Sequence, residues 1–324
     1  MRVLMVTLPL PTSETPNSMS PLAHQIKSLR ALGIEVGVCQ VTGKRKLKYV
    51  LAAPGFWAAA PAYDLIHAHF GHCGWLARTQ LRRPVVVSFM GSDLLGTPKA
   101  GGHIPRLSKM VVQANKRLAR LVKAVIVKSE EMARVVAPVR AHVIPNGVDL
   151  ELFRPMDPAE ARAALGFDPH KRYVLFPGHP LNPRKAFPLA KAAVEIAAQR
   201  TGEDIELVTL YPTPPEEVPL TMNACDVELL TSYVEGSPNV VKEAMACNLP
   251  VVAVNTGDVA ELLAGVEGCL ICPRAPEALA EGLIAVLAEA RRTNGREVLQ
   301  LKRLDLVSVA ERIRSVYADM LNRQ

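Results

Sequence analysis

The chain has 324 residues, of which 49% are hydrophobic and 21% are charged. This is the balance of an ordinary globular protein, and the length suffices for about two domains. The formal net charge is +7, but only 5% of the residues are aromatic and no binding motif is visible, so nucleic acid is not expected as a partner. No run of about 18 uncharged apolar residues occurs, so we expect no transmembrane helix. The short apolar start meets Pro9 and Pro11, which predicts a buried first strand rather than a signal peptide.

The first half of the chain alternates short apolar runs with helical patterns. In one of these patterns Ile26, Leu29 and Leu32 are in helical phase and Gly33 ends the helix. The predicted strands are 2–8, 34–41, 64–67, 84–89 and 124–128, and the predicted helices are 22–32, 104–121 and one that starts at Ser129. Strands separated by helices predict a parallel, doubly wound sheet.

A basic stretch, Lys44 to Lys48, precedes an apolar segment at 51–60 that contains Phe56 and Trp57. Cations beside apolar and aromatic side chains are typical of a segment that lies on an anionic membrane surface. A solvated surface loop is the alternative.

The pattern of alternating elements breaks between Pro145 and Pro155, where Asn146-Gly147 is a strong turn signal. We therefore expect one Rossmann-like domain at 1–150 and a second at 151–309. The predicted strands of the second half are 173–176, 204–210, 227–230, 251–254 and 270–271, and the predicted helices are 184–200, one after Pro238, 259–263, 276–290 and 310–322. Ligands of such sheets bind outside the carboxyl ends of the strands. No G-x-G-x-x-G motif supports a nicotinamide dinucleotide.

The six cysteines lie mostly in apolar runs, at positions 39, 73, 225, 247, 269 and 272. We interpret them as reduced core thiols of a cytoplasmic protein. Cys269 and Cys272 form a C-x-x-C pair without a second pair, and a metal or redox site there is the alternative.

The segment from Glu235 to Glu243 carries the most chemistry. It follows the predicted strand and opens a helix, with Ser237 suited to the N-cap and Pro238 to the first helical position. The free N–H groups of a helix start bind phosphate, and a carboxylate on each side can accept hydrogen bonds from sugar hydroxyls. This arrangement suits a sugar nucleotide, and an ordinary helix start with two solvated acids is the alternative.

The same segment resembles the E-x7-E motif of the retaining family 4 glycosyltransferases. The flanking sequence LLTSYVEGSPNVVKEAMACNLPVVA and the later Gly257-Asp258 fit this family, and the similarity is dense over 143–263. Within the family the chain is similar to bacterial enzymes of surface-polysaccharide assembly. The resemblance implies an α/β protein with the GT-B fold, in which two Rossmann-like parallel-sheet domains face a cleft. It also implies that the last helix, within 310–324, packs back on the N-terminal domain.

The resemblance implies that the second domain binds a nucleotide-sugar donor. Glu243 matches the family residue that binds the ribose hydroxyls, and Glu235 matches the one beside the transferred sugar. Arg184 and Lys185 are adjacent cations that can clamp a diphosphate, and Lys185 fits the family pattern best. His179 stands where the family has an arginine. Further donor contacts are expected from Gly236, Ser237, Asn239 and Val240.

The acceptor side is expected in the first domain. His67 and His69 face the same side of a predicted strand, but no carboxylate or cysteine set completes a metal site. By resemblance His69 lies at the reacting sugar or the acceptor, and His67 is a core residue. Gly91 and Asp93 match a His-Gly-Ser-Asp segment of the family, with Met90 in place of its histidine.

By resemblance the first loop, at 11–20, lies between donor and acceptor, and Ser18 is expected on the acceptor side. This loop has no glycine and carries Ser18-Met19 where many relatives have glycines. The leading hypothesis is a retaining, hexosyltransferase-like enzyme that uses Glu235, His69 and Lys185 in catalysis. It would move sugar from a nucleotide-sugar to a glycan or lipid-linked sugar acceptor without metal or cofactor, in the cytoplasm, as a peripheral protein of the inner face of the plasma membrane. The alternative is a non-catalytic sugar-nucleotide-binding or scaffold protein on the same fold.

Overall fold

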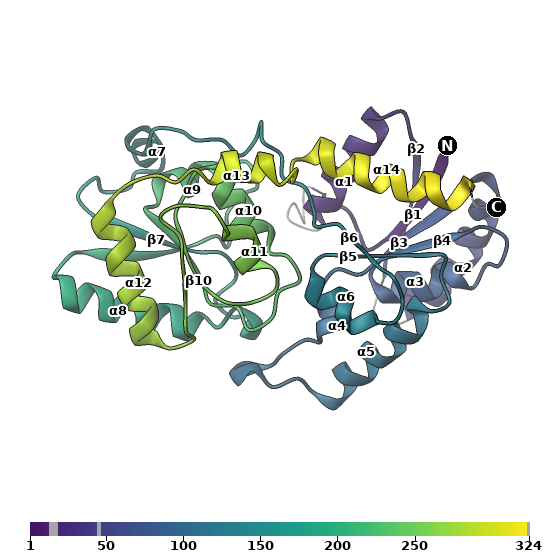
Figure 1. Ribbon diagram of the computed structural model, residues 1–324, viewed down its shortest axis with the longest axis horizontal. Helices are drawn as coiled ribbons and strands as arrows, with labels where there is room; N and C mark the ends of the chain where they lie inside the picture. Colours follow the sequence, from purple (N-terminus) through teal and green to yellow (C-terminus); the bar gives the residue numbers. More distant parts are fainter. Residues whose placement is uncertain (13–18, 44–46, 323–324) are drawn as a thin grey trace. The chain divides into compact units, whose positions relative to one another are not determined.

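The computed structural model describes all residues except 13–18, 44–46 and 323–324. The chain divides into two compact units, each with its own parallel sheet and helices on both faces (Figure 1). Unit 1 comprises Met1–Thr97, Ile104–Gly147 and Leu306–Gln324, and unit 2 comprises Pro98–His103 and Val148–Asp305. The predicted α/β class with two parallel sheets is confirmed.

The sheet of unit 1 has the strand order β2-β1-β3-β4-β5-β6. Its strands are β1 (Arg2–Thr7), β2 (Glu35–Gln40), β3 (Leu65–His69), β4 (Val85–Ser88), β5 (Ala124–Val127) and β6 (His142–Val143). All their pairings are parallel. β1 is the strand at which the order reverses, because it pairs with β2 on one side and β3 on the other.

Helices cover both faces of this sheet. One face packs against α2 (Leu47–Ala59), η1 (Ala60–Ala62), α3 (Gly71–Arg78), α4 (Ser92–Leu95), α5 (Arg106–Ala119) and α6 (Glu130–Val136). The other face packs against α1 (Ser20–Ala31) and the last helix, α14 (Leu306–Asn322). The end of the chain therefore belongs to unit 1 and buries Ile313, Tyr317 and Met320 in its core.

The sheet of unit 2 has the order β11-β10-β9-β7-β8, so β9 is its central strand. Its strands are β7 (Arg172–Phe176), β8 (Ile205–Thr209), β9 (Val227–Leu230), β10 (Val251–Val254) and β11 (Leu270–Cys272). Along β9 the side chains alternate between two cores, because successive residues of a strand point to opposite faces. Val227 and Leu229 join one cluster and Leu230 joins the other.

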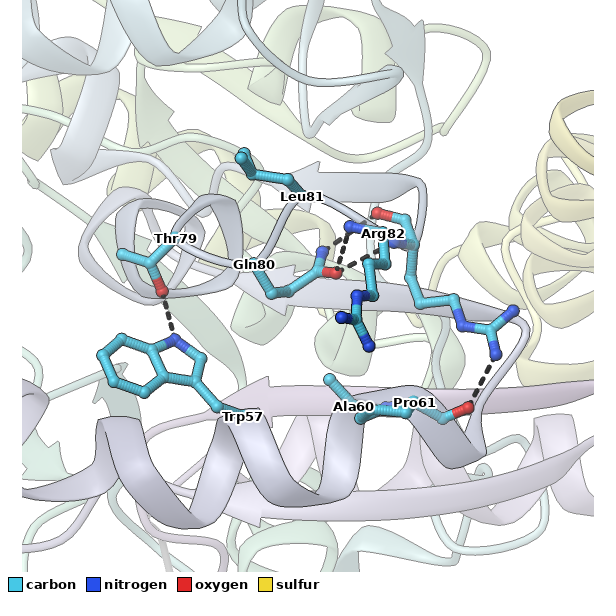
Figure 2. A pocket seen from close by; sticks show the side chains of 8 residues that line it. Trp57, Ala60, Pro61, Thr79, Gln80, Leu81 and Arg82 are labelled. Atoms are coloured by element: carbon cyan, nitrogen blue, oxygen red, sulfur yellow. Dashed lines mark hydrogen bonds between the residues drawn. The ribbon is translucent and has the colours of Figure 1, made fainter.

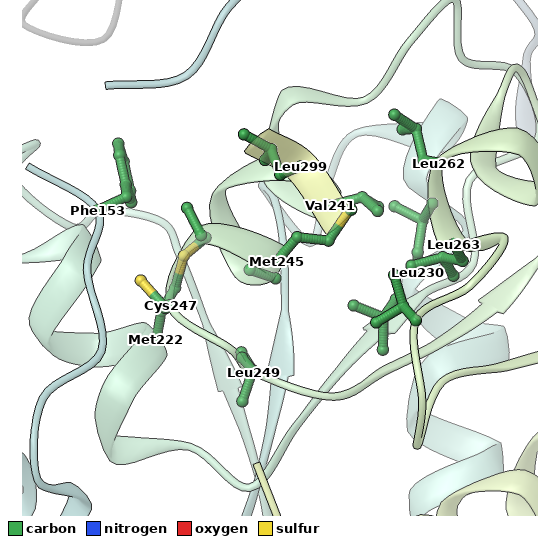
Figure 3. Packing of buried hydrophobic residues seen from close by; sticks show 14 of the residues in the cluster. Phe153, Met222, Leu230, Val241, Met245, Cys247, Leu249, Leu262, Leu263 and Leu299 are labelled. Atoms are coloured by element: carbon green, nitrogen blue, oxygen red, sulfur yellow. The ribbon is translucent and has the colours of Figure 1, made fainter. Parts of the chain in front are cut away.

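One face of this sheet is covered by α8 (Phe187–Thr201) and α12 (Pro276–Glu289). The other carries α9 (Val218–Ala224), α10 (Asn239–Ala246), α11 (Val259–Leu263) and α13 (Gly295–Leu301), while α7 (Pro158–Leu165) packs on α9. Figure 3 shows Val241 and Met245 of α10 among Leu230, Leu262 and Leu299. The apolar side of α10 thus fixes this helix against the sheet.

The predicted strands are found within two residues of their expected ends. Helices α2, α3, α4, α7, α9 and α13 were not predicted. In α2 an apolar stripe faces outward, which hides the usual amphipathic signal. Among the described residues, no helix is both long enough and apolar enough to cross a membrane.

Candidate functional site

The strand order of unit 2 reverses at β7, which pairs with β8 on one side and β9 on the other. The loops that follow β7 and β9 therefore leave the same edge of the sheet side by side. They are also bonded to each other: the Thr231 hydroxyl donates to the Lys185 carbonyl at 2.8 Å, and the Tyr233 N–H donates to the Arg184 carbonyl at 2.8 Å. Such a reversal point is where doubly wound sheets bind ligands.

Three of the predicted site residues meet at this point. Lys185 Nζ lies 2.8 Å from Glu235 Oε1, and Arg184 Nη1 lies 2.5 Å from Glu235 Oε2. Burial alone would raise the pKa of Glu235, but Lys185 and Arg184 outweigh it and hold the pKa at about 2. Glu235 is therefore an ionised, nine-tenths buried carboxylate that orients both cations.

The local sequence positions the two cations. They occupy η3 (Pro183–Lys185), where the Asn182 side chain accepts from the Arg184 N–H at 3.1 Å. The stem of Lys185 lies over Gly178, where an added Cβ would come within 3.2 Å of Lys185 Cε. Ala186 is left-handed, with φ 52°, so α8 begins at Phe187. The prediction of a helix from Arg184 was wrong for this reason.

Arg274 also holds the loop that follows β9. Its guanidinium donates to the carbonyls of Thr231 at 2.6 Å and Ser232 at 2.7 Å. It also lies 4.9 Å from the ring centroid of Tyr233. Arg274 was not predicted from the sequence, because only the sheet order brings the end of β11 near the end of β9.

Helix α10 begins at Asn239, with Pro238 as its N-cap. The prediction that Ser237 caps the helix and Pro238 opens it was wrong by one residue. Glu243 is half-buried on this helix, and burial raises its pKa to about 7, against the lowering effects of Lys242 and Lys185. Glu243 therefore interacts electrostatically with Lys185, one of the two cations paired with Glu235.

Gly257 lets the segment after β10 approach the loop that carries the first acid. Its φ is +60°, and an added Cβ would lie 2.8 Å from the Glu235 carbonyl oxygen and 3.0 Å from that of Gly236. The next residue, Asp258, faces the fully buried Lys242. Burial lowers the pKa of Lys242 to about 8, although Asp258 acts in the opposite direction. These contacts fix the backbone of the predicted donor loop at Glu235 and Gly236.

A further acid, Glu228, lies in β9 and is fully buried. Within the part of the chain that the structure describes, neither of its carboxyl oxygens has a hydrogen-bond partner. Burial, together with the charge of Glu243, raises the pKa of Glu228 to about 8, while Lys185 acts to lower it. Glu228 is therefore largely protonated at neutral pH. The sequence analysis did not single it out, although an acid within the apolar run Val227–Leu230 was a visible signal.

In unit 1 the sheet reverses at β1, and β3 next to it carries the two predicted histidines with their rings 4.2 Å apart. His67 is fully buried, with Nδ1 2.5 Å from Tyr317 Oη and Nε2 2.8 Å from Ser88 Oγ. Burial, helped by the charge of Lys128, lowers the pKa of His67 to about 3. His67 is thus a neutral core residue with both nitrogens engaged.

His69, the predicted catalytic histidine, is also fully buried. Its Nε2 lies 3.2 Å from Gln25 Nε2, and its Nδ1 has no partner among the described residues. Burial and the neighbouring His67 lower its pKa well below the ordinary range. The ring is therefore neutral and can act only as a hydrogen-bonding group in this state.

Asp93 is a structural carboxylate of the loop after β4. It accepts hydrogen bonds from the backbone N–H groups of Met90, Gly91 and Gly71 at 3.0 to 3.2 Å, and its own carbonyl accepts from Asn115. Burial raises its pKa to about 6 despite these bonds. The loop is thereby tied to the start of α3. The remaining predicted residue of this side, Ser18, lies outside the described residues.

No set of three or more His, Cys, Asp or Glu in the described ranges is arranged to hold a metal ion. All six cysteines are free thiols. One of the C-x-x-C pair, Cys269, accepts a hydrogen bond from the Val251 N–H at 3.3 Å.

Comparisons with known proteins match both units. Residues 15–152 match the family described as Glycosyltransferase Family 4, and residues 188–289 match the one described as Glycosyl transferases group 1. In sequence, both units are therefore similar to glycosyltransferases of these two families.

Curated relatives of the chain include two named D-inositol 3-phosphate glycosyltransferase. The protein of Segniliparus rotundus is 28% identical over 268 residues, covering 71% of this chain and 60% of its own length. That of Mycolicibacterium gilvum is 30% identical over 268 residues, covering 72% of this chain and 61% of its own length. The chain thus spans about three fifths of these relatives.

Solved structures share the fold. A sucrose-phosphate synthase from Thermosynechococcus elongatus has a TM-score of 0.79 at 21% identity, with both chains covered completely. HepE of Anabaena, crystallised with UDP, has a TM-score of 0.72 at 21% identity, covering 98% of this chain and all of that one. The predicted GT-B fold is confirmed.

Proposed function

We propose that the protein transfers a sugar from a nucleotide-sugar donor to a hydroxyl of an acceptor. The observation that carries this proposal is the convergence of Arg184 and Lys185 on Glu235 at the strand reversal of unit 2. Two cations held in place before any ligand binds form a diphosphate site that needs little reorganisation. The matches to two glycosyltransferase families and the UDP complex of the HepE structure support the same assignment.

In this proposal the donor diphosphate binds against Lys185, Arg184 and the backbone N–H groups around Gly236, Ser237 and Asn239. The Glu243 carboxylate accepts hydrogen bonds from the ribose hydroxyls, and Val240 lies on the same helical turn as the phosphate-facing groups. When the bond from the anomeric carbon to the distal phosphate oxygen breaks, the negative charge develops beside the two cations. A metal ion is then not required for departure of the leaving group.

Glu235 stays ionised in this scheme, since its pKa is about 2. A fixed carboxylate beside the transferred sugar stabilises the positive charge that develops at the anomeric carbon. We propose that the new bond forms with retention of anomeric configuration, as the family resemblance implies. His69 and Gly91 of unit 1 are the proposed acceptor-side groups, while the proposed role of Asp93 is to hold their loop.

The acceptor is proposed to be a glycan or a lipid-linked sugar, as for enzymes of surface-polysaccharide assembly. The names of the curated relatives add an inositol phosphate as a candidate. The protein would act in the cytoplasm at the inner face of the plasma membrane. The basic and apolar surface described below supports this location.

The test is a calorimetric screen against a panel of sugar nucleotides, followed by product analysis with each acceptor class. The wild type should bind one nucleotide-sugar, whereas Lys185→Ala and Glu243→Ala should each weaken binding at least 10-fold. Lys191→Ala, an exposed lysine of α8, is the matched control. NMR of the product reports the anomeric configuration. Equal binding by both site variants would contradict the proposed donor site.

The second candidate is binding without catalysis, which Met90 favours because a thioether cannot replace the family histidine in hydrogen bonding or proton transfer. Slow hydrolysis of the bound donor in the absence of acceptor would exclude this candidate. Tight binding with neither hydrolysis nor transfer would support it.

A further inference from the structure

The positive charge of the protein is concentrated in one stretch of unit 1. Residues 36–129 contain 15 Lys and Arg but only two acids, Asp64 and Asp93. Neither acid is paired with a cation of this stretch. Asp64 accepts a hydrogen bond from the Arg2 N–H at 2.7 Å and pairs with the Arg2 guanidinium. Asp93 is buried and accepts hydrogen bonds from backbone N–H groups. The stretch therefore carries a large excess of cations over acids, and among its exposed cations are Arg82, Arg120 and Lys123.

The same stretch also exposes apolar side chains. Of 18 large hydrophobic residues that are exposed in the described part of the chain, nine lie between residues 47 and 121. On α2, Val50, Leu51, Pro54 and Trp57 lie on one outward stripe, because residues three and four apart share a helix face. Ala53 and Phe56 on the other side of α2 are buried. An outward stripe without a charged residue is unusual for a helix that faces water.

The stripe ends at a hollow of about 270 Å³ that is lined by Trp57, Pro61, Gln80, Leu81, Arg82 and Arg83. Figure 2 shows the indole of Trp57 donating to the Thr79 hydroxyl at 2.8 Å, with Arg82 nearby. Arg83 donates to the Pro61 carbonyl at 2.7 Å, so the hollow has fixed walls. The leucine at its rim, Leu81, is 80% exposed.

A second hollow of about 530 Å³ adjoins the first, since Gln80, Leu81 and Arg83 line both. It adds Arg120, Leu121 and Lys123, which are all exposed. Neither hollow is lined by a carboxylate in the part of the chain that the structure describes. Both lie where β4 and β5 begin, at the opposite edge of the sheet from the carboxyl ends that carry the proposed site.

We propose that this face, made of the outward stripe of α2 and the rims of both hollows, docks the protein on an anionic lipid bilayer. Exposed leucine, valine and tryptophan side chains enter the interfacial region, while the arginines and Lys123 bind lipid phosphates. A nucleic acid would satisfy the cations but would leave the aliphatic side chains in water. This inference shares the proposed membrane location but does not depend on glycosyl transfer, so it can fail while the proposed transfer reaction holds.

The chain provides its own reporter for this docking. Its two tryptophans, Trp57 and Trp75, both lie in this stretch and are 50% and 37% exposed. Vesicles of 70% phosphatidylcholine and 30% phosphatidylglycerol should shift the fluorescence to shorter wavelength and protect it from an aqueous quencher. Pure phosphatidylcholine should bind at least 10-fold more weakly, and binding should fall as salt rises. No shift and no co-sedimentation with the anionic vesicles would overturn the proposal.

Two sets of variants separate the contributions of charge and apolar contact. Replacing Arg82, Arg120 and Lys123 together by Gln should weaken binding roughly 100-fold, since each cation contributes roughly fivefold near an anionic surface. The charge-matched control replaces three exposed cations of unit 2 by Gln, namely Arg154, Lys191 and Arg200. It should bind as the wild type does.

The apolar variant replaces Leu81 and Leu121 by Gln and should weaken binding about 10-fold. Its control replaces Leu181 and Leu301, which are exposed leucines of unit 2, by Gln. Thermal unfolding verifies that all variants are folded. Losses of the same size in variants and controls would overturn the proposal. The proposal would also be overturned if the protein bound duplex DNA as tightly as it binds the vesicles and if the leucine substitutions had no effect on vesicle binding.

Discussion

Glu228 offers the sharpest test of the electrostatics of unit 2. It lies in the central strand β9, fully buried, and its backbone N–H donates to the Pro250 carbonyl at 2.8 Å. Its carboxyl finds no hydrogen-bond partner among the described residues. Replacing Glu228 by Gln keeps the size and polarity of the side chain but removes its ionisation.

The expected effect follows from the pKa of Glu228, which rises from 4.5 to about 8 on folding. Below pH 4.5 the carboxyl is neutral in both states, and no penalty exists. As the pH rises above 4.5, the unfolded chain releases the proton while the folded chain keeps it, so the penalty grows until about pH 8. At about 1.4 kcal/mol per pKa unit, the penalty is about 1 kcal/mol at pH 5 and about 3 kcal/mol at pH 7.

The assay is urea unfolding of the wild type and Glu228→Gln at several pH values from 5 to 8, followed by circular dichroism. The advantage of the variant should grow by about 2 kcal/mol between pH 5 and pH 7. Glu206→Gln, which removes an exposed carboxylate from the edge strand β8, is the control and should show no such growth. A constant difference between Glu228→Gln and the wild type across this range would refute the reasoning.

Three further predictions concern the site loops and the buried histidine. Gly257→Ala should lower the free energy of unfolding by about 1–3 kcal/mol more than Gly166→Ala. Both glycines have a positive φ, but only at Gly257 would an added Cβ lie against backbone oxygens. Equal losses of stability in chemical unfolding would contradict this prediction. Tyr317→Phe removes the hydrogen bond to fully buried His67 and should cost about 1–3 kcal/mol in thermal unfolding; an unchanged midpoint would show that this bond contributes nothing. If Glu243 binds the donor, the affinity for the nucleotide-sugar measured by calorimetry should rise between pH 6 and pH 8, because this acid ionises with a pKa of about 7. The same rise in the Glu243→Gln variant would assign the titration to another group.

Much of the fold could be predicted from local sequence. Buried parallel strands appear as short apolar runs, and β9, β10 and α11 were placed with nearly correct ends because turn residues flank them. Helix ends were less accurate. Ala186 adopts a left-handed conformation that its sequence does not signal, so the helix predicted from Arg184 begins later. The outward stripe of α2 is apolar, so the periodicity of that helix was hidden.

The sequence by itself determined the elements, the E-x7-E segment and the pair of adjacent cations, because these depend on neighbours in the chain. Only the tertiary structure decided which residues act together. Parallel pairing of β7 and β9 places Lys185 within 2.8 Å of Glu235, which lies 50 residues later. The same pairing buries Glu228 in the central strand, where desolvation sets its pKa. An apolar run indicates that a strand is buried, but the order of the strands in the sheet arises from contacts distant in sequence, and no local pattern encodes it.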